Sequence, residues 1–179
     1  FQAMFRNPLA TPFTLGVASG ASLGAAISAY TGISFTILGL SATSLSAFAG
    51  ALIAISFVYS ISRFRFGFSG ETLLLTGVAI SFFFSSLILF IQYLSNVADS
   101  FQIIRWLMGS LTVVGYQELK QLLPFVMLTA VVIIYLSREL NLLMAGDEIA
   151  TSRGVSVKYV RYALFFVTSL CVGAIVALC

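Results

Sequence analysis

Long stretches without a charged residue dominate this 179-residue sequence. No Asp, Glu, Lys or Arg occurs in residues 7–62, 72–98, 121–137 or 162–179. A single helix needs about 20 mostly apolar residues to cross a bilayer, and each stretch approaches or exceeds that length. Charged residues make up 8% of the chain, against about 25% in an ordinary soluble domain. The sequence therefore excludes a soluble enzyme, a disordered chain and a nucleic-acid-binding domain.

These stretches predict an all-α, polytopic transmembrane helix bundle that forms one domain over residues 1–179. The first stretch is too long for one helix, and turn-prone residues 30–34 divide it. The predicted spans are residues 14–30, 43–62, 72–94, 121–137 and 160–178. Barrel strands are a poor alternative, because the stretches lack two-residue alternation over about ten residues. Since the chain starts at Phe1 without Met or a signal peptide, we expect an excerpt of a longer protein.

The basic residues between the spans predict an orientation. If the spans alternate in direction, seven of the nine basic residues fall on one side, and only Arg105 and Lys120 fall on the other. Cytoplasmic loops are enriched in Lys and Arg, so the seven-residue side is predicted to be cytoplasmic. On the outer side, residues 101–108 predict a short amphipathic helix with Trp106 in the interfacial aromatic belt. This helix either lies on the membrane surface or forms part of an outer vestibule or docking surface.

Small residues recur at four-residue steps in most of the predicted spans. Such faces let helices approach closely in a membrane, where the hydrophobic effect does not drive helices together. The pattern predicts a compact bundle rather than isolated anchors. The glycines expected to pack helices are Gly16, Gly20, Gly24, Gly50, Gly77 and Gly173.

The composition also limits the chemistry of the chain. It has no His, and its two cysteines, Cys171 and Cys179, lack the spacing of zinc ligands. The central parts of the spans hold no Asp, Glu, Lys or Arg, unlike those of ion-coupled carriers and proton pumps. No phosphate-binding loop of the form G-x-x-x-x-G-K-[ST] occurs. We therefore predict no catalytic residue, metal site or cofactor, and any uphill transport would need energy from another subunit.

The cytoplasmic loop 138–161 is the most distinctive segment, because it holds seven of the fifteen charges. Asp147 is a plausible N-cap of a short helix, and Gly154 is a natural stop after about two turns. Glu148 favours the positive end of the helix dipole. Two interpretations stay open for this helix: an ordinary loop helix or a docking element.

At this point the sequence resembles a known family. The residues Gly146-Asp147-Glu148-Ile149-Ala150, followed by Arg153-Gly154-Val155, are similar to the loop by which FecCD-type ABC-importer permeases contact their ATPase. Three further segments resemble the same family in the expected order: Asn-Pro-Leu-Ala-Thr-Pro at 7–12 with Leu-Gly-Val-Ala-Ser-Gly-Ala at 15–21, Leu-Leu-Leu-Thr-Gly-Val-Ala at 73–79, and Trp-Leu-Met-Gly-Ser-Leu at 106–111. Arg153 departs from the leucine that the family often has. The chain has five spans where the family has about ten.

The resemblance implies an importer permease for iron-siderophore, haem or vitamin B12-type chelates in a prokaryotic inner membrane. Its implied partners are a cytoplasmic ATPase dimer, an extracytoplasmic binding protein and a second permease subunit. It implies an inner gate at Phe68, Ser69 and Gly70, and Arg105 is a candidate for contacting the binding protein. Two alternatives remain: a structural or assembly protein without a path, and a permease fragment inactive alone. The residues implied to couple to the ATPase are Gly146, Asp147, Glu148, Ile149, Ala150, Arg153, Gly154 and Val155.

Overall fold

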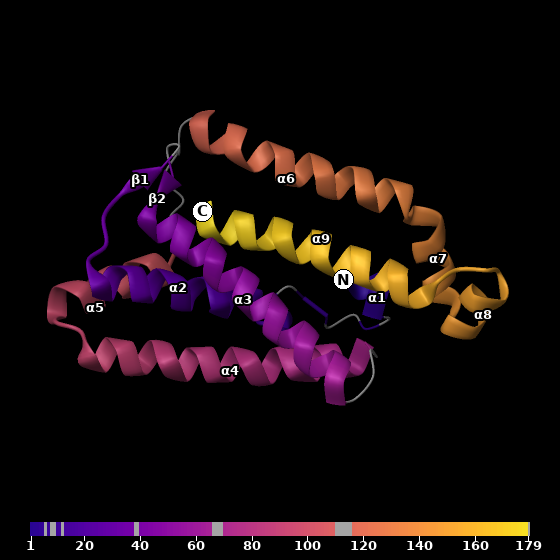
Figure 1. The fold of residues 1–179 in the computed structure, drawn as a ribbon, viewed down its shortest axis with the longest axis horizontal. Helices are drawn as coiled ribbons and strands as arrows, with labels where there is room; N and C mark the ends of the chain where they lie inside the picture. Colours follow the sequence, from indigo (N-terminus) through magenta and orange to yellow (C-terminus); the bar gives the residue numbers. More distant parts are fainter. Residues whose placement is uncertain are drawn as a thin grey trace.

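The computed structural model describes residues 1–5, 7, 10–11, 13–37, 40–65, 70–109 and 116–178. These residues form an all-α bundle with one small hairpin, which confirms the predicted fold class (Figure 1). The elements are α1 (Gln2–Phe5), a 3-10 turn (Phe13–Leu15), α2 (Val17–Thr31), β1 (Thr36–Ile37), β2 (Leu40–Ser41), α3 (Ala42–Arg65), α4 (Gly70–Leu94), α5 (Val97–Leu107), α6 (Tyr116–Tyr135), α7 (Ser137–Ala145), α8 (Asp147–Ser152) and α9 (Val157–Leu178).

Among the described residues, three helices are long and apolar enough to cross a membrane: Ala42–Ser62 within α3, Thr72–Leu94 within α4, and Val157–Leu178 in α9. The segments Leu119–Tyr135 and Ser137–Ala145 pass the same test as a pair that is bent by 59°. The first predicted span coincides with α2, which has 15 residues and is short for a crossing. The arrangement of five alternating spans stays a prediction.

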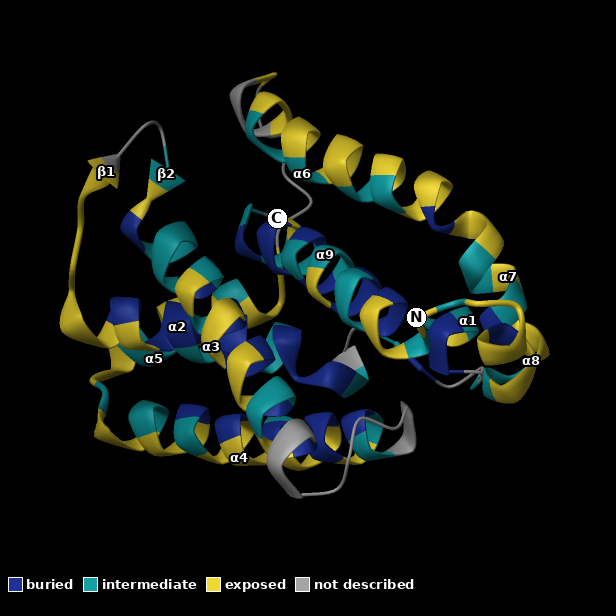
Figure 2. Ribbon diagram, turned by 45° about the vertical axis from the view of Figure 1, so that its right-hand side comes forward, coloured by how far each residue is buried: buried dark blue, intermediate teal, exposed yellow. Residues whose placement is uncertain are grey.

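Helix α2 lies among three of the long helices: it packs most extensively against α3 and also contacts α4, α9 and the shorter α5. Figure 2 shows the result in burial: α2 and α9 carry much buried surface, whereas α6 is largely exposed along its length. The main core joins Leu15, Leu73, Phe165 and Leu143, none of which is exposed. The same core therefore links the membrane helices to α7.

The crossing of α2 and α3 depends on glycines. A methyl group added to Gly24 would overlap the carbonyl oxygen of Ser46, and one added to Gly50 would overlap that of Gly20. Gly173 of α9 faces Ala51 of α3, where an added Cβ would lie 3.0 Å from the Ala51 side chain rather than against backbone. The backbones of α2 and α3 are therefore too close for any side chain larger than hydrogen at these positions.

Gly16 differs from the expected pattern, because it lies before the first turn of α2 rather than inside a helix. It has φ +76° and is the N-cap of α2. A Cβ at this position would lie 3.3 Å from the carbonyl oxygen of Gly77, and one at Gly77 would overlap the carbonyl oxygen of Thr14. Thus Gly16 and Gly77 mark the point where α4 crosses the entry to α2.

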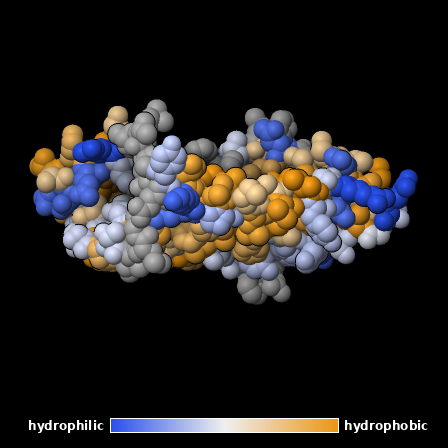
Figure 3. Space-filling view, turned by 90° about the horizontal axis from the view of Figure 1, so that it is seen from above, coloured by the Kyte–Doolittle hydropathy of each residue, from blue (hydrophilic) through white to orange (hydrophobic). Residues whose placement is uncertain are grey.

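A hairpin replaces the simple turn expected after the first span. Gly32 ends α2 with φ +63°, and β1 and β2 then pair antiparallel, with Thr36 opposite Ser41 and Ile37 opposite Leu40. The hairpin and α5 lie at one end of the molecule, whereas α1, α7 and α8 lie at the other (Figure 1). In Figure 3 hydrophobic residues fill much of the middle, and hydrophilic ones gather toward both ends, the α5 end and the α7–α8 end. Hydrophilic residues thus flank the hydrophobic middle at both ends, and the assignment of the ends to the two sides of the membrane stays a prediction.

Candidate functional site

Helix α8, the centre of the predicted coupling loop, is fixed to α9 by an ion pair. Nη2 of Arg161 donates a hydrogen bond to Oδ1 of Asp147 over 2.8 Å, and the Arg161 side chain is 9% exposed. A buried guanidinium needs a carboxylate partner, because an unpaired charge in the interior costs several kcal/mol. Ala150, one turn along α8, is fully buried. One side of α8 is therefore anchored to the bundle.

The predicted role of Asp147 as an N-cap is wrong. Asp147 is the first residue of α8, Gly146 is the N-cap with φ +139°, and no side chain caps the helix. The carboxylate of Asp147 contacts Arg161, which lies on another helix. The need to neutralise that buried cation outweighs the roughly 1 kcal/mol that a side-chain cap typically contributes.

The other end of α8 closes as a Schellman motif. The N–H of Gly154 donates to the carbonyl of Thr151 over 2.9 Å, and the N–H of Val155 donates to the carbonyl of Ala150 over 3.0 Å. Gly154 has φ +80°, so it has the left-handed conformation that this motif needs. Gly154 stops the helix at the position expected from the sequence, and the segment 146–155 has a defined shape.

The outward face of α8 remains open. Glu148, Ile149 and Arg153 are exposed, and Ile149 has 48% of its surface accessible. Val155 instead packs against the main core of the chain. Of the apolar side chains Ile149 and Val155, only Ile149 is therefore available to a partner, together with the charges of Glu148 and Arg153.

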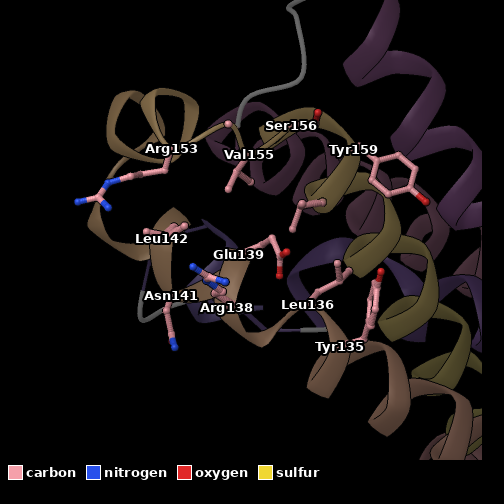
Figure 4. Close-up of a pocket in the computed structure, with 12 residues that line it drawn as sticks. Tyr135, Leu136, Arg138, Glu139, Asn141, Leu142, Arg153, Val155, Ser156 and Tyr159 are labelled. Carbon is pink, nitrogen blue, oxygen red and sulfur yellow. The ribbon is translucent and has the colours of Figure 1, made fainter.

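Next to α8 lies a groove that the sequence analysis did not identify. It has a volume of about 750 Å³ and separates α7 from the start of α9 (Figure 4). Its lining includes Arg138, Glu139, Tyr135 and Tyr159. The charges of loop 138–161 were visible in the sequence. Their assembly into one groove depends on the bend between α6 and α7, for which no Pro or Gly gives a signal.

The remaining predicted site residues are Arg105 and the three residues of the implied inner gate. Arg105 is exposed in the last turn of α5, and Trp106 beside it is partly buried against the main core. Phe68 and Ser69 lie outside the described residues, and Gly70 is the first residue of α4. Within the described part of the chain, no group of three or more His, Cys, Asp or Glu could hold a metal ion.

Comparisons with known proteins identify the kind of chain that carries this site. Residues 1–179 match the FecCD transport family. The chain is 37% identical to the cobalamin import system permease protein BtuC of Halobacterium salinarum, over 98% of this chain and 46% of that protein. It is 32% identical to the hemin transport system permease protein HmuU of Yersinia pestis, over 98% of this chain and 53% of that protein.

A solved structure agrees with these sequence matches. It is described as an inward-facing conformation of a metal-chelate type ABC transporter, and it matches with a TM-score of 0.85 and 28% identity. The match covers 99% of this chain and 55% of that one. The chain thus spans about half the length of the relatives it matches. Taken together, the family match, the relatives and the all-α membrane fold show that this chain belongs to the FecCD transport family of membrane permeases.

Proposed function

We propose that this chain forms part of the permease subunit of an ABC importer, and that α8 transmits the motion of a separate ATPase to the membrane helices. The observation that carries the proposal is the two-sided character of α8. One side is fixed to α9 through Asp147 and Arg161, and the other exposes Glu148 and Ile149. A rigid helix with one anchored side and one free side suits the transfer of force between subunits.

The cargo is a metal chelate of the iron-siderophore, haem or vitamin B12 type. This part of the proposal rests on the relatives, whose names specify cobalamin and hemin import. A chelate encloses its metal, so the described residues need no metal-binding cluster to carry it. ATP hydrolysis belongs to a partner ATPase dimer, and a second permease subunit completes the path. The complex lies in a prokaryotic inner membrane.

Two surfaces are assigned to partners outside the membrane. The exposed face of α8 contacts the ATPase, where Glu148 pairs with a basic residue and Ile149 supplies apolar contact. At the opposite end, Arg105 of α5 is assigned to an acidic surface of the extracytoplasmic binding protein. Its position at the exposed C-terminal turn of α5 supports that assignment.

The test is charge reversal at Glu148 in the complete transporter. Glu148→Arg is expected to weaken ATPase association about tenfold, because a charge-assisted hydrogen bond is worth about 1.5–3 kcal/mol. Substrate-stimulated ATP hydrolysis falls with it, while membrane insertion is unchanged. Lys120→Glu is the matched control, since Lys120 is also exposed but lies in the first turns of α6, away from α8. Unchanged association in Glu148→Arg would exclude α8 as the coupling element.

A further inference from the structure

The groove beside α8 has no role in the proposed coupling, which uses the outward face of the helix. Its volume of about 750 Å³ lies within the usual range of small-molecule sites. One wall comes from the end of α6 and from α7. The other comes from residues 153–156 and the first turn of α9. Buried Leu136 and Val160 belong to the lining, so part of the groove is apolar.

The groove lies where α6 ends and α9 begins. Val157–Leu178 starts at one wall, and the bent pair of α6 and α7 forms the other. Tyr135 and Tyr159 lie on the same side of the groove in Figure 4 and are 80% and 69% exposed. Tyrosine gathers at the headgroup level of membranes, with its ring among the lipids and its hydroxyl near water. These rings therefore place the mouth of the groove at the membrane interface.

The interior of the groove offers two opposite charges. Glu139 is partly buried, and its Oε2 is inaccessible to solvent without a hydrogen-bond partner among the described residues. Figure 4 shows its carboxylate in the middle of the groove, between Arg138 and Tyr135 in that view, while Arg153 points away. A hydrogen bond between a carboxylate and a cationic N–H donor is about twice as strong as one between neutral groups. The site therefore favours a ligand that brings N–H donors to Glu139 and an anion to Arg138.

We infer that the groove binds the headgroup of a phospholipid that carries both a phosphate and a primary ammonium group. The ammonium donates hydrogen bonds to the carboxylate of Glu139, which lines the groove, and the phosphate accepts them from the guanidinium of Arg138. The acyl chains leave past Tyr135 and Tyr159 toward the apolar surfaces of α6 and α9. A basic protein segment would also satisfy Glu139. The exposed tyrosines at the mouth favour the lipid, and the inference does not depend on the coupling role of α8.

The experiment compares headgroups on the full-length native protein, purified in detergent without its ATPase. Phosphatidylethanolamine, phosphatidylcholine and phosphatidylglycerol of the same chain length are titrated, and binding is followed by native mass spectrometry and thermal shift. Choline carries no N–H donor, and phosphatidylglycerol has no cation. Phosphatidylethanolamine is therefore expected to bind about tenfold more tightly than either, which corresponds to one charge-assisted hydrogen bond.

Three variants define the site. Glu139→Gln is expected to reduce the preference for ethanolamine over choline to less than about twofold, and Glu139→Asp is expected to retain part of it. Arg138→Gln should weaken all three lipids, because each carries the phosphate. Lys120→Gln, at the opposite end of α6, should change nothing. Melting profiles of each variant show whether the fold is intact, and Glu139→Asp keeps the test valid if Glu139→Gln unfolds.

The inference is overturned if the wild-type protein binds the three headgroups equally, or if Glu139→Gln keeps the full preference. It is also overturned if Glu139 becomes protected from carboxylate labelling only when the ATPase is added, and lipids have no effect. That last result would assign the groove to a protein partner.

Discussion

Arg161, a buried cation in the first turns of α9, is bound at 2.8 Å to Asp147, the first residue of α8. This contact joins the exposed loop helix to a helix that is long and apolar enough to cross the membrane. The two residues are 14 positions apart in the chain. This side-chain contact therefore links α8 to α9 directly, in addition to the covalent connection through Gly154 and Val155.

Breaking this ion pair is expected to destabilise the packing of α8 on α9 and to weaken the mechanical link between the two helices. Removing one partner of a fully buried pair costs about 3–5 kcal/mol. Because the Asp147 side chain is 40% exposed, Asp147→Asn should cost less, about 1–2 kcal/mol. Thermal unfolding of Asp147→Asn, Arg161→Gln and the double variant forms a cycle. If the destabilisation of the double variant equals the sum of the two single-variant values, the ion pair contributes nothing to stability.

Variants of the Asp147–Arg161 pair can distinguish a loss of ATPase association from a loss of motion transfer after association. Asp147→Asn should leave ATPase association nearly unchanged, because its carboxylate points to α9, whereas substrate-stimulated hydrolysis should fall. The exchanged pair Asp147→Arg with Arg161→Asp is expected to recover part of that loss. If Glu148→Arg weakens association while Asp147→Asn has no effect on stimulation, then α8 docks the ATPase but the ion pair does not transmit its motion.

The crossing of α2 and α3 should reject a large side chain at Gly50. Its added Cβ would meet the carbonyl oxygen of Gly20, and backbone cannot move aside as a side chain does. Gly50→Leu is expected to cost at least the 1–3 kcal/mol typical of overpacking, with loss of monodisperse protein in size-exclusion chromatography. Ala49→Leu on the same helix is the control, because Ala49 is exposed. Similar behaviour of both variants would contradict the close crossing.

Substitutions at Gly154 should destabilise the protein through backbone conformation alone, without steric overlap. Nothing lies within 4 Å of a Cβ built there, but its φ is +80°. Gly154→Ala is therefore expected to cost about 1–2 kcal/mol through backbone strain, and Gly154→Asn less, since Asn adopts the left-handed conformation more readily. The readout is faster hydrogen exchange at the amides of Gly154 and Val155, which close the Schellman motif. Equal exchange rates in both variants and the wild-type protein would refute the argument.

A buried hydroxyl should be dispensable at Ser169. This residue is fully buried, and its Oγ has no hydrogen-bond partner in the described structure. Removing an unsatisfied polar atom from an apolar site does not lose a bond, so Ser169→Ala is expected to leave the melting temperature unchanged or raise it. Thr129→Ala provides the contrast. The Thr129 hydroxyl donates to the carbonyl of Phe125 within α6 over 2.8 Å and lies 3.4 Å from the carbonyl of Val167 on α9, and its loss should cost about 0.6 kcal/mol. A large loss in Ser169→Ala would show that the hydroxyl has a partner.

Much of the helix content followed from the sequence. The predicted segments 43–62, 72–94 and 160–178 lie within α3, α4 and α9, because long charge-free runs have few structural alternatives in a membrane. The segment 121–137 corresponds to most of α6, and residues 101–108 overlap α5. The glycine stop at residue 154 was also predictable, since the left-handed conformation strongly favours glycine.

What the sequence could not provide was the set of contacts between distant segments. The bend at Leu136 follows no Pro or Gly, and Leu136 and Leu143 are buried in the main core on either side of it. Packing of α7 against that core, rather than local propensity, accounts for its direction. The groove around Glu139 exists only because of this bend. No local pattern could have indicated it.

Asp147 shows, within one residue, what local sequence determines and what only tertiary packing determines. The sequence by itself determined that a short, charged helix would follow Gly146 and end at Gly154, since capping and stop signals act between near neighbours. Only the tertiary structure decided that the Asp147 carboxylate contacts Arg161 instead of capping its own helix. That choice depends on where a cation on another helix is buried. Burial is a property of the packed bundle, and the energy of an unpaired buried charge exceeds that of a cap.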